Sequence, residues 1–491
     1  MGWGFYCCVL QVVSFSGDGV YDHCGVTEKL EARLGHKLVF IWDPMHKAAL
    51  VDTGMRAGKK KWTKDFKWLV EMTKVIGKGV NMVAWGKSWR VFFLICEELE
   101  KEPDTVFKMK RPSKFSETKF ADHAHDVYDK FRNDMKPLLI VFEKAKEAKE
   151  GGTSDEKKKA DLADEIQGKV YNWLFVLSLS MVTDIYKVYR SISLVLQKID
   201  MLPQDKFDAF KKYLGKYESM LASMDPGGCP CQCVFWDLKD KVWKETQEEL
   251  CPWPRFHEDV NRALDSATYQ GVPMGLVRHE EYRTRVGTGV NMLWLEVEVE
   301  GVVKTVVERG KKMVEFVKEG LEEKVYTDSD VELVEQCRIL HDIRSQALQV
   351  EEHGAVRISS LKYKAFRGAA LYFEPNLEQR LDPDDLRIQW RTFNDVLEDL
   401  IRKQPAASSL DFMKLLLHPS KKLYRGVEGV LSILVRAAVA RGGLESVCET
   451  MVSVMEAHTP SLRGILDQRR LEDEILVAWN GEDVFHCDQV Q

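Results

Sequence analysis

Two carboxylates and a histidine near the start of the chain have the types and spacing of a metal-dependent site. Asp18 lies between two glycines, directly after an apolar run, and Asp43 and His46 are three residues apart after a second run. Carboxylate oxygens bind hard divalent cations, and an imidazole beside a carboxylate can orient a metal ligand. The alternative is an ordinary Asp-Gly turn, followed by a helix cap with a surface histidine.

The elements that must position these residues are two short strands joined by a helix. Apolar runs predict strands from Gly4 to Phe15 and from Lys37 to Trp42, and the segment EKLEARLG between them is helical in pattern. A strand, a helix and a strand over so short a distance indicate part of an α/β layer with a parallel sheet. Asp18 and Asp43 then each follow the end of a strand.

The remainder of the chain reads as predominantly helical. Apolar residues recur at helical spacing in several long segments, whereas the charged segment 143–165 resembles a solvated helix end and loop. The segment 172–203 is the most apolar, and its length and the terminal Pro203 favour a buried helix. The predicted helical segments are 65–100, 172–203, 291–325, 386–400, 422–441 and 444–457.

The composition describes a globular protein of two or three structural units. The 491 residues are 45% hydrophobic and 30% charged, with a formal net charge of −6 and a pI of about 6.1. No general basic field attracts nucleic acid, so any DNA contact must come from local patches. No run of eighteen apolar residues predicts a membrane span, and no small-molecule substrate is evident. Eleven scattered cysteines favour a reducing compartment.

The order of several motifs resembles the hAT superfamily of transposases. The stretch SGDGVYDHCGVTEKLEARLG followed by VFIWDPMHKAALVD is similar to the central blocks of that family. The family's C-x-x-H motif reads Asp43-Pro44-Met45-His46 here, with aspartate in place of cysteine. KFSETKFADH, from Lys114, is similar to the family's TRW block, and FVLSLSMVTDIYKVYRSISLVLQ resembles the helix pair of its inserted domain.

A last block near the C-terminus resembles the family's dimerisation segment. ESVCETMVSVMEAHTPSLRGILDQRRLEDEILVAWN places Glu449 at the family's acidic position, although Cys448, Thr450 and Val452 depart from the pattern. The resemblance implies a partial RNase H-like core in residues 1–120, a helical insertion in 121–430, and a core-completing and dimerisation segment in 431–491. The expected fold class is therefore an α/β core interrupted by a large, mostly α-helical insertion.

The resemblance also implies a mechanism for DNA cleavage and strand transfer. Three carboxylates of the RNase H-like core bind two Mg²⁺ or Mn²⁺ ions, and Asp18 and Glu449 would be the second and third acids. Asp43 and His46 would lie in the second shell. The resemblance places the first acid of the set upstream of Asp18, where only seventeen residues precede it. Nearby carboxylates that could take its place are those of Asp22, Asp43 and Asp52. We therefore expect an incomplete, catalytically inactive site with no cofactor.

Two basic clusters are candidate contacts to DNA phosphates. They comprise Lys59, Lys60, Lys61 and Lys64 in one segment and Lys108, Lys110 and Arg111 in another. Tryptophans near the first cluster could stack on exposed bases. The alternative is a solvated helix face. Expected partners are DNA and a second copy of the chain, in the nucleus, with the cytoplasm as the alternative compartment.

A group of cysteines offers a weaker zinc hypothesis. Cys229, Cys231 and Cys233 alternate in GGCPCQCVFW, with Cys251 and His257 further along. Zinc sites usually use C-x₂₋₄-C spacing, and three alternating cysteines fit one tetrahedron badly. Reduced loop thiols are therefore the favoured interpretation.

Three functions remain open from the sequence. The first is a transposase-derived protein without catalytic activity that associates with DNA or with itself. The second is an active metal-dependent DNA transposase or nuclease, which needs a third carboxylate near Asp18 and Glu449. The third is a helical protein-interaction scaffold that does not bind DNA.

Overall fold

A computed structural model describes more than half of the chain. The described residues are 14–17, 25–56, 65–83, 86–99, 121–148, 152–198, 201–224, 235–237, 242–244, 251–265, 268–274, 299–353, 363–377, 381–403 and 426–439. They fall into two compact units. Unit 1 contains Met1–His46, Leu196–Asp208 and Tyr326–Gln491, and unit 2 contains Lys47–Val195 and Ala209–Val325. The sequence-based ranges 1–120, 121–430 and 431–491 stay a prediction.

Unit 1 begins with the predicted strand–helix–strand unit. The strands β1 (Ser14–Gly17) and β2 (Val39–Trp42) pair in parallel, and helix α2 (Val26–Leu34) connects them. The register matches Ser14 with Val39 and Gly17 with Trp42, so the two strands end side by side. The predicted parallel pairing is confirmed for these residues, whereas the expected beginning of the first strand, residues 4–13, lies outside the described part.

The turn after α2 fixes where β2 begins. Gly35 has a φ of 75° and donates its N–H to the carbonyl of Glu31, a left-handed helix end that glycine adopts without steric cost. The Glu31 carboxylate accepts hydrogen bonds from Lys37 Nζ at 2.7 Å and from the backbone N–H of Leu38 at 2.9 Å. One side chain thus ties the helix end to the start of the strand.

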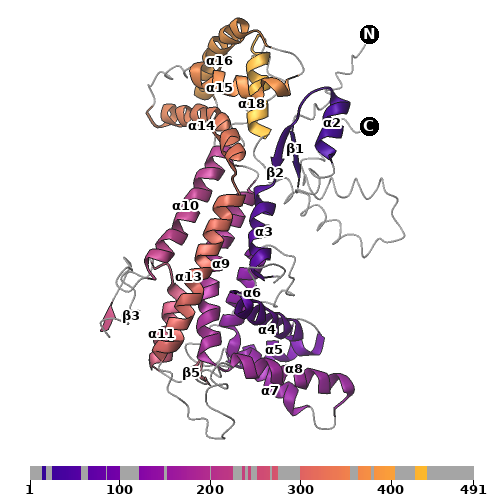
Figure 1. The fold of residues 1–491 in the computed structure, drawn as a ribbon, viewed down its shortest axis with the longest axis vertical. Coiled ribbons are helices and arrows are strands. Elements are labelled where there is room, and N and C mark those ends of the chain that lie inside the picture. Colours follow the sequence, from indigo (N-terminus) through magenta and orange to yellow (C-terminus); the bar gives the residue numbers. More distant parts are fainter. Residues whose placement is uncertain are drawn as a thin grey trace. The chain divides into compact units, whose positions relative to one another are not determined.

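The described helices of unit 1 that follow residue 326 pack around an aromatic core. Figure 1 shows the helices of this core grouped together. The buried Trp390 ring stacks on Phe366 at a centroid distance of 4.2 Å and on Phe393 at 5.5 Å. The helical elements are α14 (Asp328–His353), α15 (Tyr363–Phe373), the 3₁₀ turn η3 (Glu374–Asn376), α16 (Pro383–Lys403) and α18 (Glu428–Val439).

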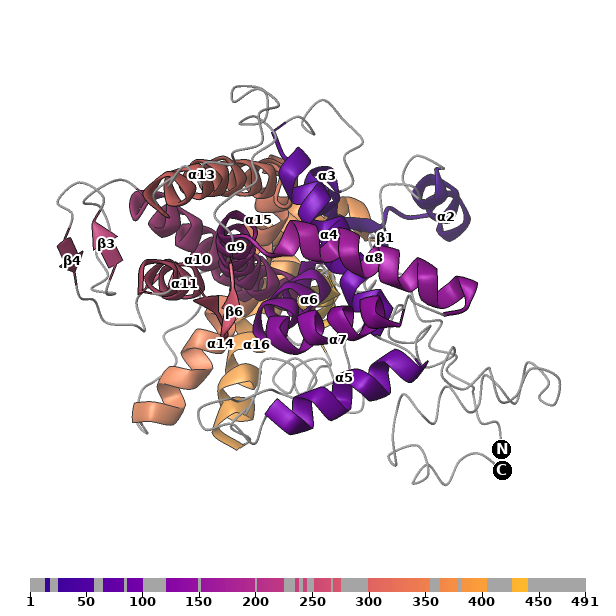
Figure 2. The ribbon, with the colours of Figure 1, turned by 90° about the horizontal axis from the view of Figure 1, so that it is seen from below.

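Unit 2 is built from helices that pack along one another. Figure 2 shows α4, α6, α7 and α8 gathered beside α9. The helices within this unit are α4 (Lys67–Val83), α5 (Gly86–Leu99), α6 (Ala121–Asn133), α7 (Met135–Glu147), α8 (Ser154–Val170), α11 (Pro254–Asp265) and α13 (Val299–Lys324). Helices α3 (Pro44–Arg56), α9 (Trp173–Gln197) and α10 (Pro203–Ala222) contribute residues to both units.

Short antiparallel strand pairs complete unit 2. They are β3 (Phe235–Asp237) with β4 (Val242–Lys244) and β5 (Thr268–Tyr269) with β6 (Val272–Pro273). Gln270 and Gly271, between the second pair, both have a positive φ, as a tight hairpin requires.

The prediction of a predominantly helical chain is confirmed for the described residues, whereas the RNase H-like core stays a prediction. The segment 65–100 contains α4 and α5, and the segment 291–325 contains most of α13, from Val299 onward. The segment 386–400 lies within α16, and 422–441 contains α18. The alternation in VEVEGVV does not produce a strand from Val299 onward, because buried residues of α13 recur at helical spacing instead. The segment 444–457 lies outside the described residues.

Two local expectations were wrong. Most of the charged segment 143–165 is helical. Thr153 and Glu156 form a capping box that begins α8. The buried side chains of Ala160 and Ala163 give this helix a face that packs against the core. Pro203 does not terminate the preceding helix, which ends at Gln197. Instead, Pro203 is the first residue of α10, where its missing N–H costs nothing.

Glycines allow α13 to approach its neighbours closely within unit 2. A Cβ on Gly310 would lie 1.8 Å from Met181 Sδ on α9, and a Cβ on Gly320 would lie 2.8 Å from Val51 Cγ1 on α3.

Across the described part of the chain, no helix is both long enough and apolar enough to cross a membrane.

Candidate functional site

The edge where β1 and β2 end is the place where the sequence predicted a metal site. Asp43 directly follows β2 and is fully buried, and its Oδ1 accepts the backbone N–H of Met45 at 2.8 Å. Pro44 is the first residue of α3. Asp43 is therefore the N-cap of α3, which was the alternative left open by the sequence.

His46 lies in the first turn of α3 and is half-buried. The spacing of three residues does place it and Asp43 at the beginning of the same helix, as the sequence predicted. A role of either side chain in orienting a metal ligand stays a prediction.

The other predicted site residues lie outside the described part of the chain. This applies to both proposed acids, to both basic clusters and to one substitute acid: Asp18, Glu449, Lys59, Lys60, Lys61, Lys64, Lys108, Lys110, Arg111 and Asp22. The substitute Asp52 is described, and it is buried and accepts a hydrogen bond from the Tyr186 hydroxyl at 2.5 Å. Within the described ranges, no group of three or more His, Cys, Asp or Glu residues could hold a metal ion.

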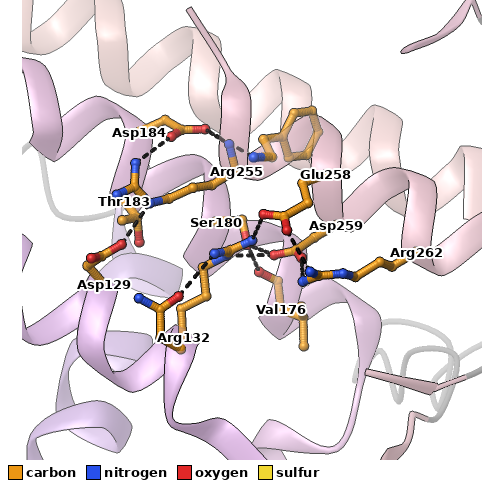
Figure 3. A network of polar contacts seen from close by, with 12 residues as sticks. Asp129, Arg132, Val176, Ser180, Thr183, Asp184, Arg255, Glu258, Asp259 and Arg262 are labelled. Atoms are coloured by element: carbon orange, nitrogen blue, oxygen red, sulfur yellow. Dashed lines mark hydrogen bonds and ion pairs between the residues drawn. The ribbon is translucent and has the colours of Figure 1, made fainter. Parts of the chain in front are cut away.

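A cluster of polar side chains within unit 2 links α6, α9 and α11. Figure 3 shows Arg132 of α6 directed at Asp259 of α11, with Ser180 of α9 beside their contact. Arg132 Nε donates to Asp259 Oδ2 at 2.8 Å and Nη2 donates to Glu258 Oε2 at 2.6 Å. The Ser180 hydroxyl also donates to Asp259. Only 6% of the Arg132 side chain and none of the Asp259 side chain is exposed to solvent.

Arg132 remains charged in this environment. Burial alone would lower the pKa of its guanidinium, but the negative charges of Asp259 and Glu258 outweigh burial and raise that pKa above its ordinary value. Arg262 on the next turn of α11 donates to Asp259 Oδ1 at 2.9 Å. The buried charges are thus paired and hydrogen-bonded to one another, as their removal from water requires.

A second carboxylate of α9 holds the beginning of α11. Asp184 Oδ2 accepts the backbone N–H groups of Arg255 and Phe256, each at 3.0 Å, in the first turn of the helix (Figure 3). These N–H groups have no partner within the helix, and a negative charge is favoured there. Burial raises the pKa of Asp184 to about 7, against the lowering effect of these hydrogen bonds and of Arg255.

This cluster fixes helix positions and has no evident catalytic arrangement. The Ser180 hydroxyl donates to the Asp259 carboxylate, which Arg132 and Arg262 also bind. Both arginines are therefore neutralised by carboxylates of the same chain. A nucleophile needs a base that accepts its proton, and a phosphate site needs cations that are not already neutralised. The arrangement instead joins three helices by directional contacts.

Cys251 and His257 form a second polar contact, immediately before and within the first turn of α11. Cys251 Sγ lies 3.2 Å from His257 Nδ1 and accepts the backbone N–H of Trp253 at 3.3 Å. Burial lowers the pKa of His257 to about 4, so its ring is neutral at pH 7. The sequence identified both residues without predicting that they meet, and Cys229, Cys231 and Cys233 lie outside the described part.

Sequence reasoning missed the α6–α9–α11 cluster, although one signal was present. Asp184 is the only charged residue in the apolar stretch WLFVLSLSMVTDIY, residues 173–186. A charged side chain on a buried helix face must be paired with an opposite charge or with hydrogen-bond donors, because an unpaired buried charge is strongly unfavourable. The identity of that partner could not be read from the sequence, because the α11 residues that it binds lie 71 and 72 positions away.

Comparisons with known proteins return no relative. No protein-family model matches the chain, and neither a curated protein nor a solved structure matches it.

Proposed function

We propose that this chain is a catalytically inactive relative of hAT transposases that acts by associating with DNA or with a second copy of itself. The observation that carries the proposal is the β1–α2–β2 unit at its start. Gly17 and Trp42 are register partners of a parallel pair, and an aspartate follows each of them in the sequence. Strand ends that carry carboxylates at one sheet edge are the framework in which RNase H-like enzymes hold metal ions.

The contacts of Asp43 and Asp52, two carboxylates that could complete the metal site, support the proposed lack of catalytic activity. Asp43 is buried and caps α3 through the N–H of Met45. Asp52 is buried and accepts the Tyr186 hydroxyl. Metal ligation would compete with these hydrogen bonds, and a two-ion site needs several carboxylates at once. Both side chains are therefore already engaged in contacts that hold the fold together.

The test of DNA association is fluorescence anisotropy with a labelled duplex and the purified full chain. We expect a rise in anisotropy that weakens as salt is added, because lysine–phosphate contacts release counterions. Replacing Lys59, Lys60 and Lys61 with alanine should weaken binding by roughly tenfold or more at low salt. The matched control replaces Lys157, Lys158 and Lys159, an exposed lysine run on α8, and should change binding little.

Equal weakening by both triple variants would show a nonspecific effect of charge and remove the basic-cluster part of the proposal. Light scattering of the same samples tests self-association. A monomer at all concentrations, together with no DNA binding, would contradict the proposed function.

A helical interaction scaffold without DNA binding is the second candidate. It is favoured by large apolar side chains on the surface of unit 1, where Leu371 is 59% and Ile388 is 62% exposed. A scaffold predicts no salt-sensitive rise in anisotropy for the wild-type chain. It also predicts that the chain still forms a complex with itself or with another protein.

A further inference from the structure

We propose that His125 on α6 is an acid-sensitive switch of unit 2, and that its protonation loosens the contacts of α6 with α9 and α11. The buried ring lies beside two Asp–Arg pairs that join these helices, and a proton on the ring would disturb both pairs. The proposal concerns unit 2 alone and is independent of the function proposed above.

The ring of His125 is buried and one of its nitrogens has no partner. Only 5% of the side chain is exposed to solvent. Nδ1 lies 3.4 Å from Asp126 Oδ1, whereas Nε2 has no hydrogen-bond partner among the described residues. A neutral imidazole leaves only an unpaired acceptor at Nε2, but an imidazolium carries an N–H on both nitrogens. Protonation would therefore bury a charged donor that has no acceptor, which is strongly unfavourable.

The carboxylate beside Nδ1 already binds another cation. Arg190 Nη1 on α9 lies 3.2 Å from the same oxygen, Asp126 Oδ1. The Nε of Arg190 is buried without a hydrogen-bond partner among the described residues. A protonated His125 would thus compete with Arg190 for Asp126, and this ion pair is a link between α6 and α9.

The second Asp–Arg pair links α6 to α11. Arg255 Nε donates to Asp129 Oδ1 at 2.7 Å, and the backbone N–H of Arg255 donates to Asp184 on α9 (Figure 3). Asp129 lies one helical turn after His125 on α6. A charge on His125 would be repelled by Arg255 and would draw Asp129 toward itself.

These surroundings keep His125 neutral in the folded chain. Burial lowers the pKa of His125 below its ordinary value of 6.5, and the positive charges of Arg255 and Arg190 act in the same direction. The carboxylates of Asp129 and Asp126 raise that pKa, but they do not offset the other effects. The folded chain therefore resists protonation of His125 at pH values at which an exposed histidine takes up a proton.

The direction of the pH dependence follows from this lowered pKa. The contribution of the neutral ring to stability is complete above pH 6.5 and is lost as the pH falls below 6.5 toward the pKa of the folded chain. Helix α4 also packs against α6, where the uncharged hydroxyls of Thr73 and Tyr128 lie 2.9 Å apart. Helix α7 follows the far end of α6. The charges that act on His125 thus come from α6, α9 and α11.

Asp184 has the opposite effect over the same pH range. Its pKa is raised to about 7 in the folded chain, so folding takes up a proton at Asp184 below this pH. Folding releases a proton at His125 below pH 6.5, and the two contributions oppose each other. The effect of His125 is therefore measured in the Asp184→Asn background, in which position 184 does not titrate.

The test compares Asp184→Asn with Asp184→Asn/His125→Asn in the purified full chain. Asparagine does not titrate and keeps an N–H donor near the position of Nδ1. Amide hydrogen exchange of α6 and α11, corrected for the intrinsic pH dependence of exchange, reports how often these helices open. Between pH 7 and 5.5, the opening constant of Asp184→Asn should rise several-fold relative to that of the double variant, with a limit of about tenfold per pH unit.

The matched control is Asp184→Asn/His341→Asn. His341 belongs to unit 1, where its Nδ1 lies 2.8 Å from Asp205 Oδ1. This variant also lacks one histidine but should keep the acid-dependent opening of α6 and α11. The same pH dependence with and without His125, or its loss in the His341 control, would overturn the proposal.

A second measurement uses the wild-type chain. The ring signals of ¹³C-labelled histidines are followed by NMR against pH, and the His125 signal is the one that is missing from both His125→Asn and His125→Gln. Its titration midpoint should lie below 6.5. A midpoint at or above 6.5 would contradict the proposed switch, whatever the stability of the variants.

Discussion

Both units have apolar cores with paired aromatic rings, and unit 2 adds a buried cluster of charged side chains to its core. In unit 1, α15 and α16 meet through stacked rings, with Trp390 between Phe366 and Phe393. In unit 2, α6, α9 and α11 meet through Arg132, Ser180 and Asp259. Apolar contacts tolerate changes of shape that preserve volume, whereas buried charges require a partner at a fixed distance and angle. Unit 2 should therefore be the less tolerant of conservative substitutions.

The largest effect is expected for Arg132→Leu. This change leaves the buried Asp259 with fewer partners and should lower the free energy of unfolding by about 3–5 kcal/mol. Chemical denaturation of the purified chain measures the loss. The control is the double variant Arg132→Leu/Asp259→Leu, which removes both charges and should recover part of that loss. A double variant less stable than the single variant would contradict a coupled pair.

A pH-dependent effect is expected from Asp184. Because its pKa in the folded chain is raised to about 7 from an ordinary value of 3.8, its favourable contribution is complete below pH 3.8. That contribution is lost as the pH rises through 7. A shift of about three units corresponds to at most about 4 kcal/mol.

Asp184→Asn removes this titration and keeps an oxygen that can accept the N–H groups of Arg255 and Phe256. The unfolding free energy of Asp184→Asn, relative to that of the wild type, should therefore improve as the pH rises from 5 to 8. Denaturation curves at each pH measure the difference. A difference that stays constant over this range would show that Asp184 is ionised throughout.

A smaller loss is expected where α13 approaches α9 in unit 2. A Cβ on Gly310 would lie 1.8 Å from Met181 Sδ and 3.0 Å from Met224 Cε, so Gly310→Ala should cost about 1–3 kcal/mol through overpacking. Gly215→Ala on α10 is the matched control, because nothing lies within 4 Å of its Cβ position. That control should be neutral or slightly stabilising, and equal effects at both sites would contradict the close approach.

The smallest effect is expected in the aromatic core of unit 1. Leu397 is buried on α16, and Leu397→Met keeps the volume and apolar character of the site. Its cost should stay below about 1.5 kcal/mol. Thermal unfolding should be measured for Leu397→Met and for Asp259→Asn in unit 2, since both substitutions change the side-chain volume little. The loss in melting temperature should be smaller for Leu397→Met. A greater loss for Leu397→Met would reverse the proposed contrast between the units.

The sequence predicted the elements better than it predicted the contacts between them. Apolar spacing identified the helices, and two apolar runs identified the parallel strands, because these patterns are local. The roles of Asp43 and Asp184 show the limit. Asp43 caps the helix that follows it directly, which the sequence allowed as an alternative, whereas Asp184 caps a helix about seventy residues away.

The same limit applies to the candidate sites. The pattern of cysteines was visible, but the contact between Cys251 and His257 required the first turn of α11 to be placed. The pairing of Arg132 with Asp259 spans 127 residues, and helical periodicity states which face is buried without naming the neighbour on it.

The most direct test of the proposed function is a combined binding and cleavage assay on one labelled DNA duplex with Mg²⁺ or Mn²⁺. We predict that the full chain raises the anisotropy of the duplex in a salt-sensitive manner and leaves every strand uncut. Strand cleavage that depends on the metal ion and disappears in Asp18→Ala would contradict the account, because it would require a complete set of metal-binding carboxylates.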